Sequence, residues 1–172
     1  MSFKLSTDNI LEESVYPIKT PNPANTVETI LTALSEIEAE IDSEQIDSRI
    51  EELDTGGIFL GKAKRSCLHI KLNNSRKDEL KKLGIVIFPV EFGNLVYLKK
   101  YEYIQGDWFS RNSTSAFERT VKIKEKLKNI EDYMQYTFIM TLGDYCFTQL
   151  IRRFDPDVET NLKLYQVFLR EL

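Results

Sequence analysis

The chain of 172 residues has little of what a metal centre or a disulfide-bonded fold requires. It contains one histidine, His69, and two cysteines, Cys67 and Cys146, that lie far apart. One histidine and two remote cysteines cannot complete a tetrahedral zinc site without carboxylates. We therefore expect no metal site, no cofactor and no disulfide framework.

Long apolar runs are also missing. No stretch approaches the roughly 20 apolar residues of a membrane span, and the densest one, Tyr133 to Ile151, is interrupted by Gln135, Asp144 and Gln149. The first residues, MSFKLSTDNILEES, contain neither a basic leader nor the apolar run of a signal peptide. The sequence predicts a soluble, cytoplasmic protein with reduced thiols and no membrane partner.

Glycine and proline are scarce, with seven and five residues, and the apolar fraction is 42%, which is typical of a globular protein with one core. Charge is instead segregated along the chain. Residues 1–57 hold 13 acidic and 3 basic residues, residues 58–130 hold 16 basic and 7 acidic residues, and residues 131–172 return to a net charge of −3. Such separation indicates association, either within the fold or with a partner.

The first third predicts an arm followed by a helix. The prolines of residues 1–24 disfavour a helix and predict an extended N-terminal arm. Asn25 and Glu28 have the spacing of a helix N-terminus. Apolar residues then recur at spacings of three and four, which predicts an amphipathic helix with one narrow apolar seam: Val27, Ile30, Leu34, Ile37 and Ile41. Because Ile46, Ile50 and Leu53 resume this spacing on a rotated face, we expect an acidic helical segment over residues 25–54, with either a kink or a second short helix capped by Ser43.

The middle, residues 57–104, changes to the alternation of strands. We expect strands at 57–62, 65–72, 85–92 and 95–104, with a short basic helix at 75–83 after the second strand. Gly93-Asn94 predicts a two-residue hairpin turn. Pro89 predicts that its strand is an edge or carries a bulge at that point.

The last third predicts helices over residues 116–172; within residues 158–172 the helix is favoured and a strand at NLKLYQVFL is the alternative. The predicted fold is therefore α+β. A four-stranded, mostly antiparallel sheet in the order strand-strand-helix-strand-strand is packed with N-terminal and C-terminal helices, and residues 25–172 form one domain.

Two motifs resemble catalytic centres and fail on physical grounds. Residues 56–63, GGIFLGKA, have the spacing of a phosphate-binding loop, but Ala63 replaces the hydroxyl that would hold magnesium, and a strand rather than a helix is predicted to follow. Cys67 and His69 share one face of one predicted strand, where they seldom reach hydrogen-bond contact. We interpret both as parts of ordinary strands.

The carboxylates do not converge either. Glu79 lies in an acid-x-lysine step, as in metal-dependent nucleases, but on a predicted helix instead of a strand. Glu91 and Glu102 would face each other across the predicted hairpin without a third acid. A metal-dependent hydrolase using one of these three residues is our least favoured hypothesis.

The alternative to a protein partner is nucleic acid. The strand at 95–104 places Tyr97, Lys99, Tyr101 and Tyr103 on one face and Lys100 on the other. Bases stack on aromatic rings while lysines meet phosphates, which predicts a single-strand interface: Lys99, Lys100, Tyr101, Tyr103, Arg76, Lys77, Lys81 and Lys82. In the competing interpretation the tyrosines are core residues, and the lysines protect a strand edge from aggregation.

The leading hypothesis is a non-catalytic protein-protein interaction or assembly protein, a subunit of a larger complex that binds another protein or copies of itself. Its predicted contact is the narrow apolar seam on the acidic helix, together with the arm. The residues expected to bind the partner are Ile30, Leu34, Ile37 and Ile41. The sequence leaves open whether the acidic helix covers the basic segment or projects from it.

Overall fold

The structure is a computed structural model that describes residues 2–41, 43–54, 64–105, 115–155 and 157–158. The elements are, in order, β1 (Ser2–Lys4), a 3-10 turn η1 (Thr7–Asn9), β2 (Ile10–Lys19), α1 (Pro23–Ile41), β3 (Ile46–Asp54), β4 (Lys64–Leu72), α2 (Asp78–Lys82), β5 (Leu83–Phe92), β6 (Leu95–Ile104), α3 (Ala116–Lys126) and α4 (Ile130–Phe154). The predicted α+β class is confirmed.

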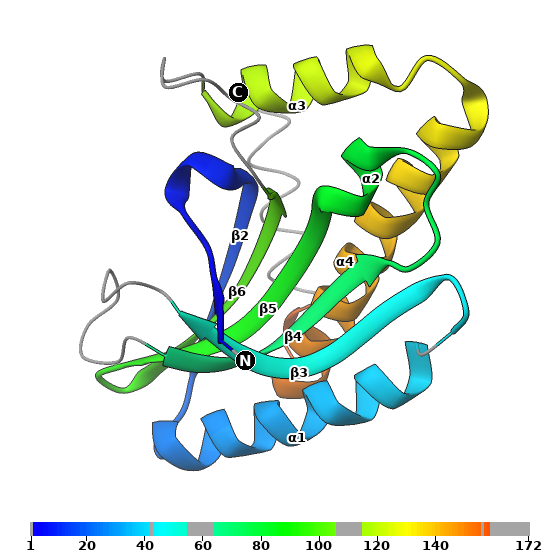
Figure 1. Cartoon of the computed structure of the whole chain (residues 1–172). Helices are drawn as coiled ribbons and strands as arrows, with labels where there is room; N and C mark the ends of the chain where they lie inside the picture. Colours follow the sequence, from blue (N-terminus) through cyan, green and yellow to red (C-terminus); the bar gives the residue numbers. More distant parts are fainter. Residues whose placement is uncertain (1, 42, 55–63, 106–114, 156, 159–172) are drawn as a thin grey trace.

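The sheet has six strands in the order β1-β3-β4-β5-β6-β2, not the predicted four (Figure 1). Five of them form an antiparallel series from β3 to β2, and β1 adds to β3 in parallel. Three segments for which predictions were made lie outside the described residues. They are the predicted strand at 57–62, the motif at 56–63 with the spacing of a phosphate-binding loop, and residues 159–172.

The order of the strands requires the sheet to curl. β1 and β2 are its two outer strands, yet only residues 5–9 connect them. In a flat sheet the outer strands would be about 24 Å apart, whereas this connection spans at most about 21 Å when fully extended. Three of its residues form η1, which shortens it further. The sheet therefore curls so that its two edges approach each other, and it has an outer and an inner face.

Two predictions about the first third are wrong. The arm predicted for residues 1–24 contains β1 and β2, and β2 pairs with β6 along its length. Pro17 is tolerated because β2 is an edge strand with an open side. The helix predicted to reach residue 54 ends at Ile41, and Ile46–Asp54 is β3. Ile46 and Ile50 lie four residues apart, a spacing that places them on one face of a helix and equally of a strand.

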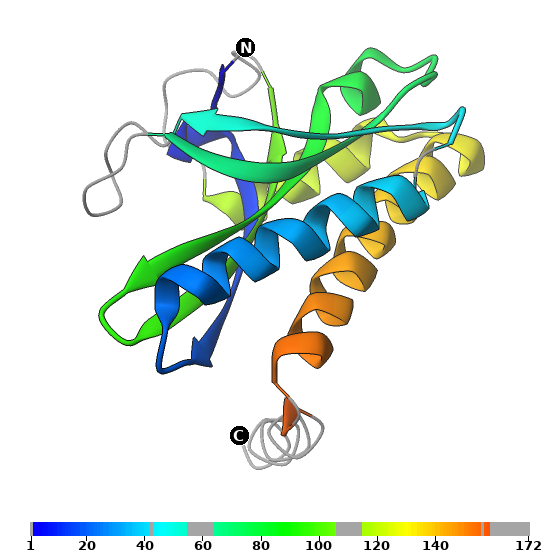
Figure 2. The ribbon, with the colours of Figure 1, turned by 90° about the horizontal axis from the view of Figure 1, so that it is seen from below.

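α1 and α4 both cover the outer face of the sheet (Figure 2). α1 begins at Pro23 rather than after Asn25, because Asn22 Oδ1 accepts a hydrogen bond from the Asn25 N–H at 3.2 Å. Gly143 lets α4 approach β5 closely, since a Cβ there would lie 2.3 Å from Ile85 Cδ1. We call the apolar layer between this face and the two helices the helix-side core; it includes Ile30, Leu34, Leu68, Ile85, Leu98, Ile139, Cys146 and Leu150.

The inner face has its own apolar cluster. Its described members lie in strands or in the β1–β2 connection. We call it the inner-face core: Leu5, Leu53, Cys67, Val86, Phe88, Val90, Tyr101 and Tyr103, all buried. Leu5 belongs to the β1–β2 connection, and Ile10, at the start of β2, packs against the cluster. The segment that joins the two edges of the sheet therefore also helps to fill the inside of the curl.

The β5–β6 hairpin agrees with the sequence pattern. Phe92 pairs with Leu95, and Gly93 has a φ of 61° while Asn94 has a negative φ, as in a type II′ turn. β4 pairs with β5 only from Gly84 to Ile87, so Pro89 lies where β5 has no partner on the β4 side. The expectation that the strand is an edge at this proline is confirmed.

The segregated charge of the sequence is largely matched inside the fold. Acidic β3 pairs with basic β4, where Lys64 Nζ lies 3.4 Å from Glu52 Oε2. Acidic β2 pairs with basic β6, where Lys99 Nζ lies 3.0 Å from Glu13 Oε1. Strand pairing thus brings opposite charges together, and the acidic helix α1 lies on apolar residues instead of a basic face.

Candidate functional site

The predicted partner-binding seam of α1 is part of the core. Ile30, Leu34 and Ile37 are buried, and Ile41 is half-buried against them. A narrow seam of this kind serves either an intermolecular contact or a contact with the chain's own sheet, and here the sheet occupies it. The four side chains are therefore part of the chain's own core, and a contact between them and a partner remains a prediction.

The predicted nucleic-acid face is buried as well. Lys100 is 1% exposed, and Tyr101 and Tyr103 belong to the core. Lys99 is half-buried and bonds to Glu13 Oε1, which also accepts from the Tyr101 hydroxyl at 3.1 Å. The alternation of these side chains is as predicted, but rings inside a curled sheet cannot stack on bases.

The basic helix predicted at 75–83 is shorter than expected and spans Asp78–Lys82. Lys81 lies 3.0 Å from Asp78, and Lys77 lies 3.5 Å from Asp132 of α4. Arg76 is exposed and Lys82 is half-buried. The four cations of the hypothesis therefore do not extend the tyrosine-bearing strand into one surface, and two of them are already paired with acids.

His69 lies in a buried polar network on the inner face. Its Nδ1 bonds to Glu51 of β3, and its Nε2 bonds to the hydroxyl of Tyr103 on β6. A carboxylate only accepts hydrogen bonds, so Nδ1 carries the proton of the neutral ring, and the Tyr103 hydroxyl donates to Nε2. The network links three strands that are far apart in the sequence, which is why sequence patterns did not reveal it.

Burial lowers the pKa of His69, and Glu51 opposes this effect without reversing it, while Lys71 and Arg49 reinforce it. Burial likewise raises the pKa of the Tyr103 hydroxyl. Both groups are therefore neutral near pH 7. Each ring nitrogen of His69 thus has a partner inside the fold, and the network joins β3, β4 and β6.

Cys67 does not form a reactive couple with His69. Its side chain belongs to the inner-face core, and burial raises the pKa of its thiol to about 12. A thiol is a nucleophile only as the thiolate, so this cysteine is chemically quiet. Cys146 is also buried and free, in the helix-side core.

A second polar network lies under α4. Lys100 Nζ lies 2.8 Å from Glu102 Oε1 and also bonds to Asp144 of α4. Burial alone would lower the pKa of Lys100, but the hydrogen bonds to both carboxylates outweigh it and raise the pKa. Burial raises the pKa of Glu102, against the effect of Lys100. This arrangement anchors α4 to the sheet with a buried cation.

The carboxylates of the hydrolase hypothesis do not meet. Glu91 pairs with Val96, whereas Glu102 pairs with Ile85, so the expectation that the two face each other is wrong. Glu79 lies on α2. Among the described residues no three histidine, cysteine, aspartate or glutamate side chains come together as a metal site would need.

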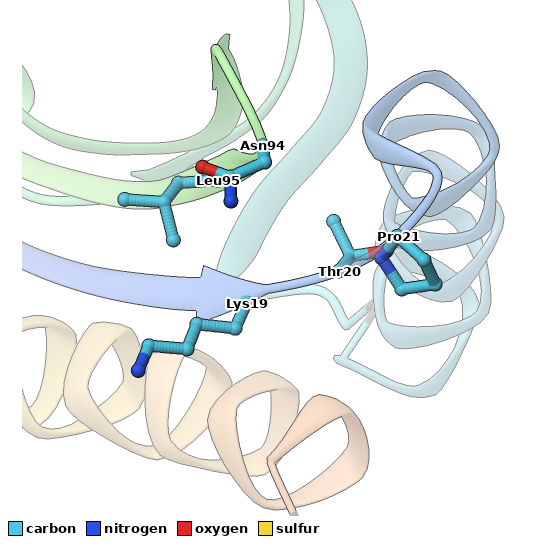
Figure 3. A pocket seen from close by; sticks show the side chains of 5 residues that line it. All are labelled: Lys19, Thr20, Pro21, Asn94 and Leu95. Carbon is cyan, nitrogen blue, oxygen red and sulfur yellow. The ribbon is translucent and has the colours of Figure 1, made fainter.

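A shallow groove of about 510 Å³ lies where the β2–α1 corner meets the end of the β5–β6 hairpin (Figure 3). It is lined by Lys19, Thr20, Pro21, Asn94 and Leu95. Of the described residues that line it, Lys19 is the charged one. These residues offer the groove one cation and a few polar atoms.

The surface that sequence reasoning missed is the side of α4 that faces away from the sheet. Four of its large apolar residues are exposed, which we call the outer stripe: Ile130, Met134, Phe138 and Tyr145. Ile130 and Met134 are 74% and 64% exposed. On a helix with 3.6 residues per turn the stripe lies within an arc of about 80°. The signal was present in the sequence, because YMQYTFIMTLG contains no charged residue over three turns.

The inner side of the same helix is the one that packs on the sheet. It carries Tyr136, Ile139, Gly143, Cys146, Phe147, Leu150 and Ile151, all buried. α4 thus has two apolar sides, of which the described part of the chain covers one. α3 leads into α4 and carries two further exposed apolar residues, Phe117 and Val121.

No protein-family model and no curated protein matches the chain. None of the helices in the described ranges has the length and apolar character to cross a membrane.

Proposed function

We propose that this protein is a non-catalytic protein-interaction protein, a subunit of a larger assembly, and that the outer stripe of α4 is its docking surface. The observation that carries the proposal is the exposure of four large apolar side chains on one side of a helix whose other side already fills the core. Contiguous apolar surface of this kind marks an interaction site in soluble proteins.

The composition of the stripe supports a protein partner. It combines two aromatic residues with a methionine and an isoleucine, and the exposed residues Thr137 and Thr141 beside them are uncharged, while exposed Glu131 and Asp144 flank the stripe. Aromatic residues and methionine are enriched in protein–protein interfaces, and charged residues are depleted at their centre. An amphipathic partner helix or a second flat apolar surface fits such a stripe.

The non-catalytic part of the proposal is supported by the state of the reactive groups. The His69 ring is buried and bonded through both nitrogens, and burial raises the pKa of the Cys67 thiol to about 12. The side chains that catalytic hypotheses would use are therefore committed to holding the strands.

The test is site-specific photo-crosslinking in the cells that produce the protein. A photoreactive residue replaces Met134 in the outer stripe, and a matched variant carries it at Glu40, which is exposed on α1. We expect a discrete cross-linked species from position 134 and none from position 40. If position 134 yields no protein adduct, the stripe is not a docking surface and the proposal fails.

A further inference from the structure

We propose that the occupant of the outer stripe is a second copy of this chain, with the two α4 helices antiparallel about a two-fold axis. This inference rests on the proposed function and names its partner. It is carried by the distribution of charge and of apolar side chains along α4, which is self-complementary when the helix is turned end for end.

The charges of α4 have opposite sign at its two ends. Glu131 is exposed in the first turn, and Arg152 is exposed in the last. The 25-residue helix is about 37 Å long. A parallel pair would place like charges together, whereas an antiparallel pair places the acidic end of each helix beside the basic end of the other. Antiparallel alignment also sets the positive end of each helix dipole beside the negative end of the other.

The positions also match in register. About a centre between Thr141 and Leu142, Glu131 of one copy stands opposite Arg152 of the other. The same centre places Phe138 opposite Tyr145. In a two-fold contact each such pair occurs twice, because residue i meets residue j and j meets i. One register thus satisfies both the charged ends and the aromatic middle.

The charged and apolar residues of the proposed pairing lie on one side of α4. Glu131 and Arg152 fall within an arc of about 100° together with the four stripe residues, on a helix with 3.6 residues per turn. Aromatic, methionine and isoleucine side chains provide ridges for antiparallel helices that cross at about 20°. A contact made by one helix pair lies at the small end of specific interfaces, below about 1,200 Å². We therefore expect a dimer that dissociates on dilution.

The first experiment measures mass against concentration for the purified full chain by sedimentation velocity. Phe138→Ser is compared with Phe92→Ser, because Phe92 is exposed to a similar degree, 52% against 46%, but lies at the β5–β6 turn. We expect Phe138→Ser to raise the dimer dissociation constant about 10- to 100-fold, since the change acts twice in a two-fold interface, and Phe92→Ser to leave it unchanged. Equal effects, or a monomer at every concentration, would overturn the proposal.

The second experiment tests the register. Glu131→Arg and Arg152→Glu are each expected to weaken the dimer about tenfold, because both symmetric pairs become like-charged. The double variant restores opposite charges and should return the dissociation constant to within about threefold of the original. If each single change weakens the dimer and the double variant is weaker still, the antiparallel register is wrong.

The outcomes separate this inference from the proposed function. A cross-linked adduct at position 134 with twice the mass of the chain supports the second copy. An adduct of another mass, from a chain that is monomeric when purified, keeps the docking surface and overturns self-association. An intrachain cross-link from position 134 to residues 159–172 identifies the chain's own C-terminal segment as the occupant and overturns both proposals.

Discussion

α1 and α4 are both amphipathic helices on the same face of the sheet, but they differ in how many apolar sides they have. α1 has one apolar seam, and the fold buries it. α4 has a buried inner side and an exposed outer stripe. The regular amphipathic pattern therefore belonged to α1, whose apolar side is buried in the core. The nearly all-apolar pattern belonged to α4, which carries the exposed outer stripe.

The physical reason is that a helix needs one apolar side to bind its own sheet. Once that side is buried, further apolar residues on the opposite side contribute nothing to the monomer and expose surface that water disfavours. Regular spacing thus identifies the side that folding uses. Apolar residues left over after that side is assigned indicate an interaction.

The largest expected effect concerns the buried cation beneath α4. Lys100→Met removes the cation that bonds to Glu102, which is itself buried. We expect a loss of about 3–5 kcal/mol in the free energy of unfolding, because a buried carboxylate is left without its partner. Urea denaturation measures it. The double variant Lys100→Met/Glu102→Leu should recover a large part of the lost free energy of unfolding. No recovery would show that the unpaired carboxylate is not the cause of the loss.

The next effect compares the two helices directly. Leu34→Ala in the buried seam of α1 should cost about 2–5 kcal/mol, as large-to-small changes in a core do. Met134→Ala in the outer stripe should change the free energy of unfolding by no more than about 0.5 kcal/mol at concentrations where the chain is monomeric. Thermal and urea denaturation of both variants check this contrast. Similar losses would contradict the assignment of one side to the core and the other to the surface.

A smaller effect is expected at the inner side of α4. Gly143→Ala improves helix propensity by about 1 kcal/mol, but the new Cβ would lie 2.3 Å from Ile85 Cδ1 in a filled core. We expect a net loss of about 1–2 kcal/mol. Ile85→Val removes that methyl group, so in the Gly143→Ala background it should be less harmful than in the original chain. Purely additive losses would argue against this close approach.

The smallest effect lies away from both helices, in the network of His69. Burial lowers the pKa of His69 in the folded protein, so the unfolded chain, with a histidine pKa of about 6.5, takes up a proton first as the pH falls. The stability that this difference provides is complete above the unfolded pKa and is lost as the pH falls from there through the folded pKa. His69→Gln, which does not titrate, should show a flatter dependence of urea midpoints between about pH 7.5 and 5.5. Equal pH dependence in both proteins would rule this out.

Local patterns predicted the second half of the fold well. The β5–β6 hairpin follows from Gly93-Asn94 and the alternation around it, and the helical character of α3 and α4 follows from their periodicity. The two faces of β6 were also predicted, since alternation alone decides them. What alternation could not supply is whether the tyrosine-bearing face is open or enclosed.

By itself, the sequence determined the α+β class, the hairpin and the helices within residues 116–154, because each depends on neighbouring residues or on composition. Only the tertiary structure decided that the N-terminal arm is two outer strands, that Ile46–Asp54 is β3, and that Glu51, His69 and Tyr103 join. These outcomes depend on strand pairing between distant segments and on the curl of the sheet. A spacing of four residues fits a helix and a strand alike, and burial depends on what lies opposite.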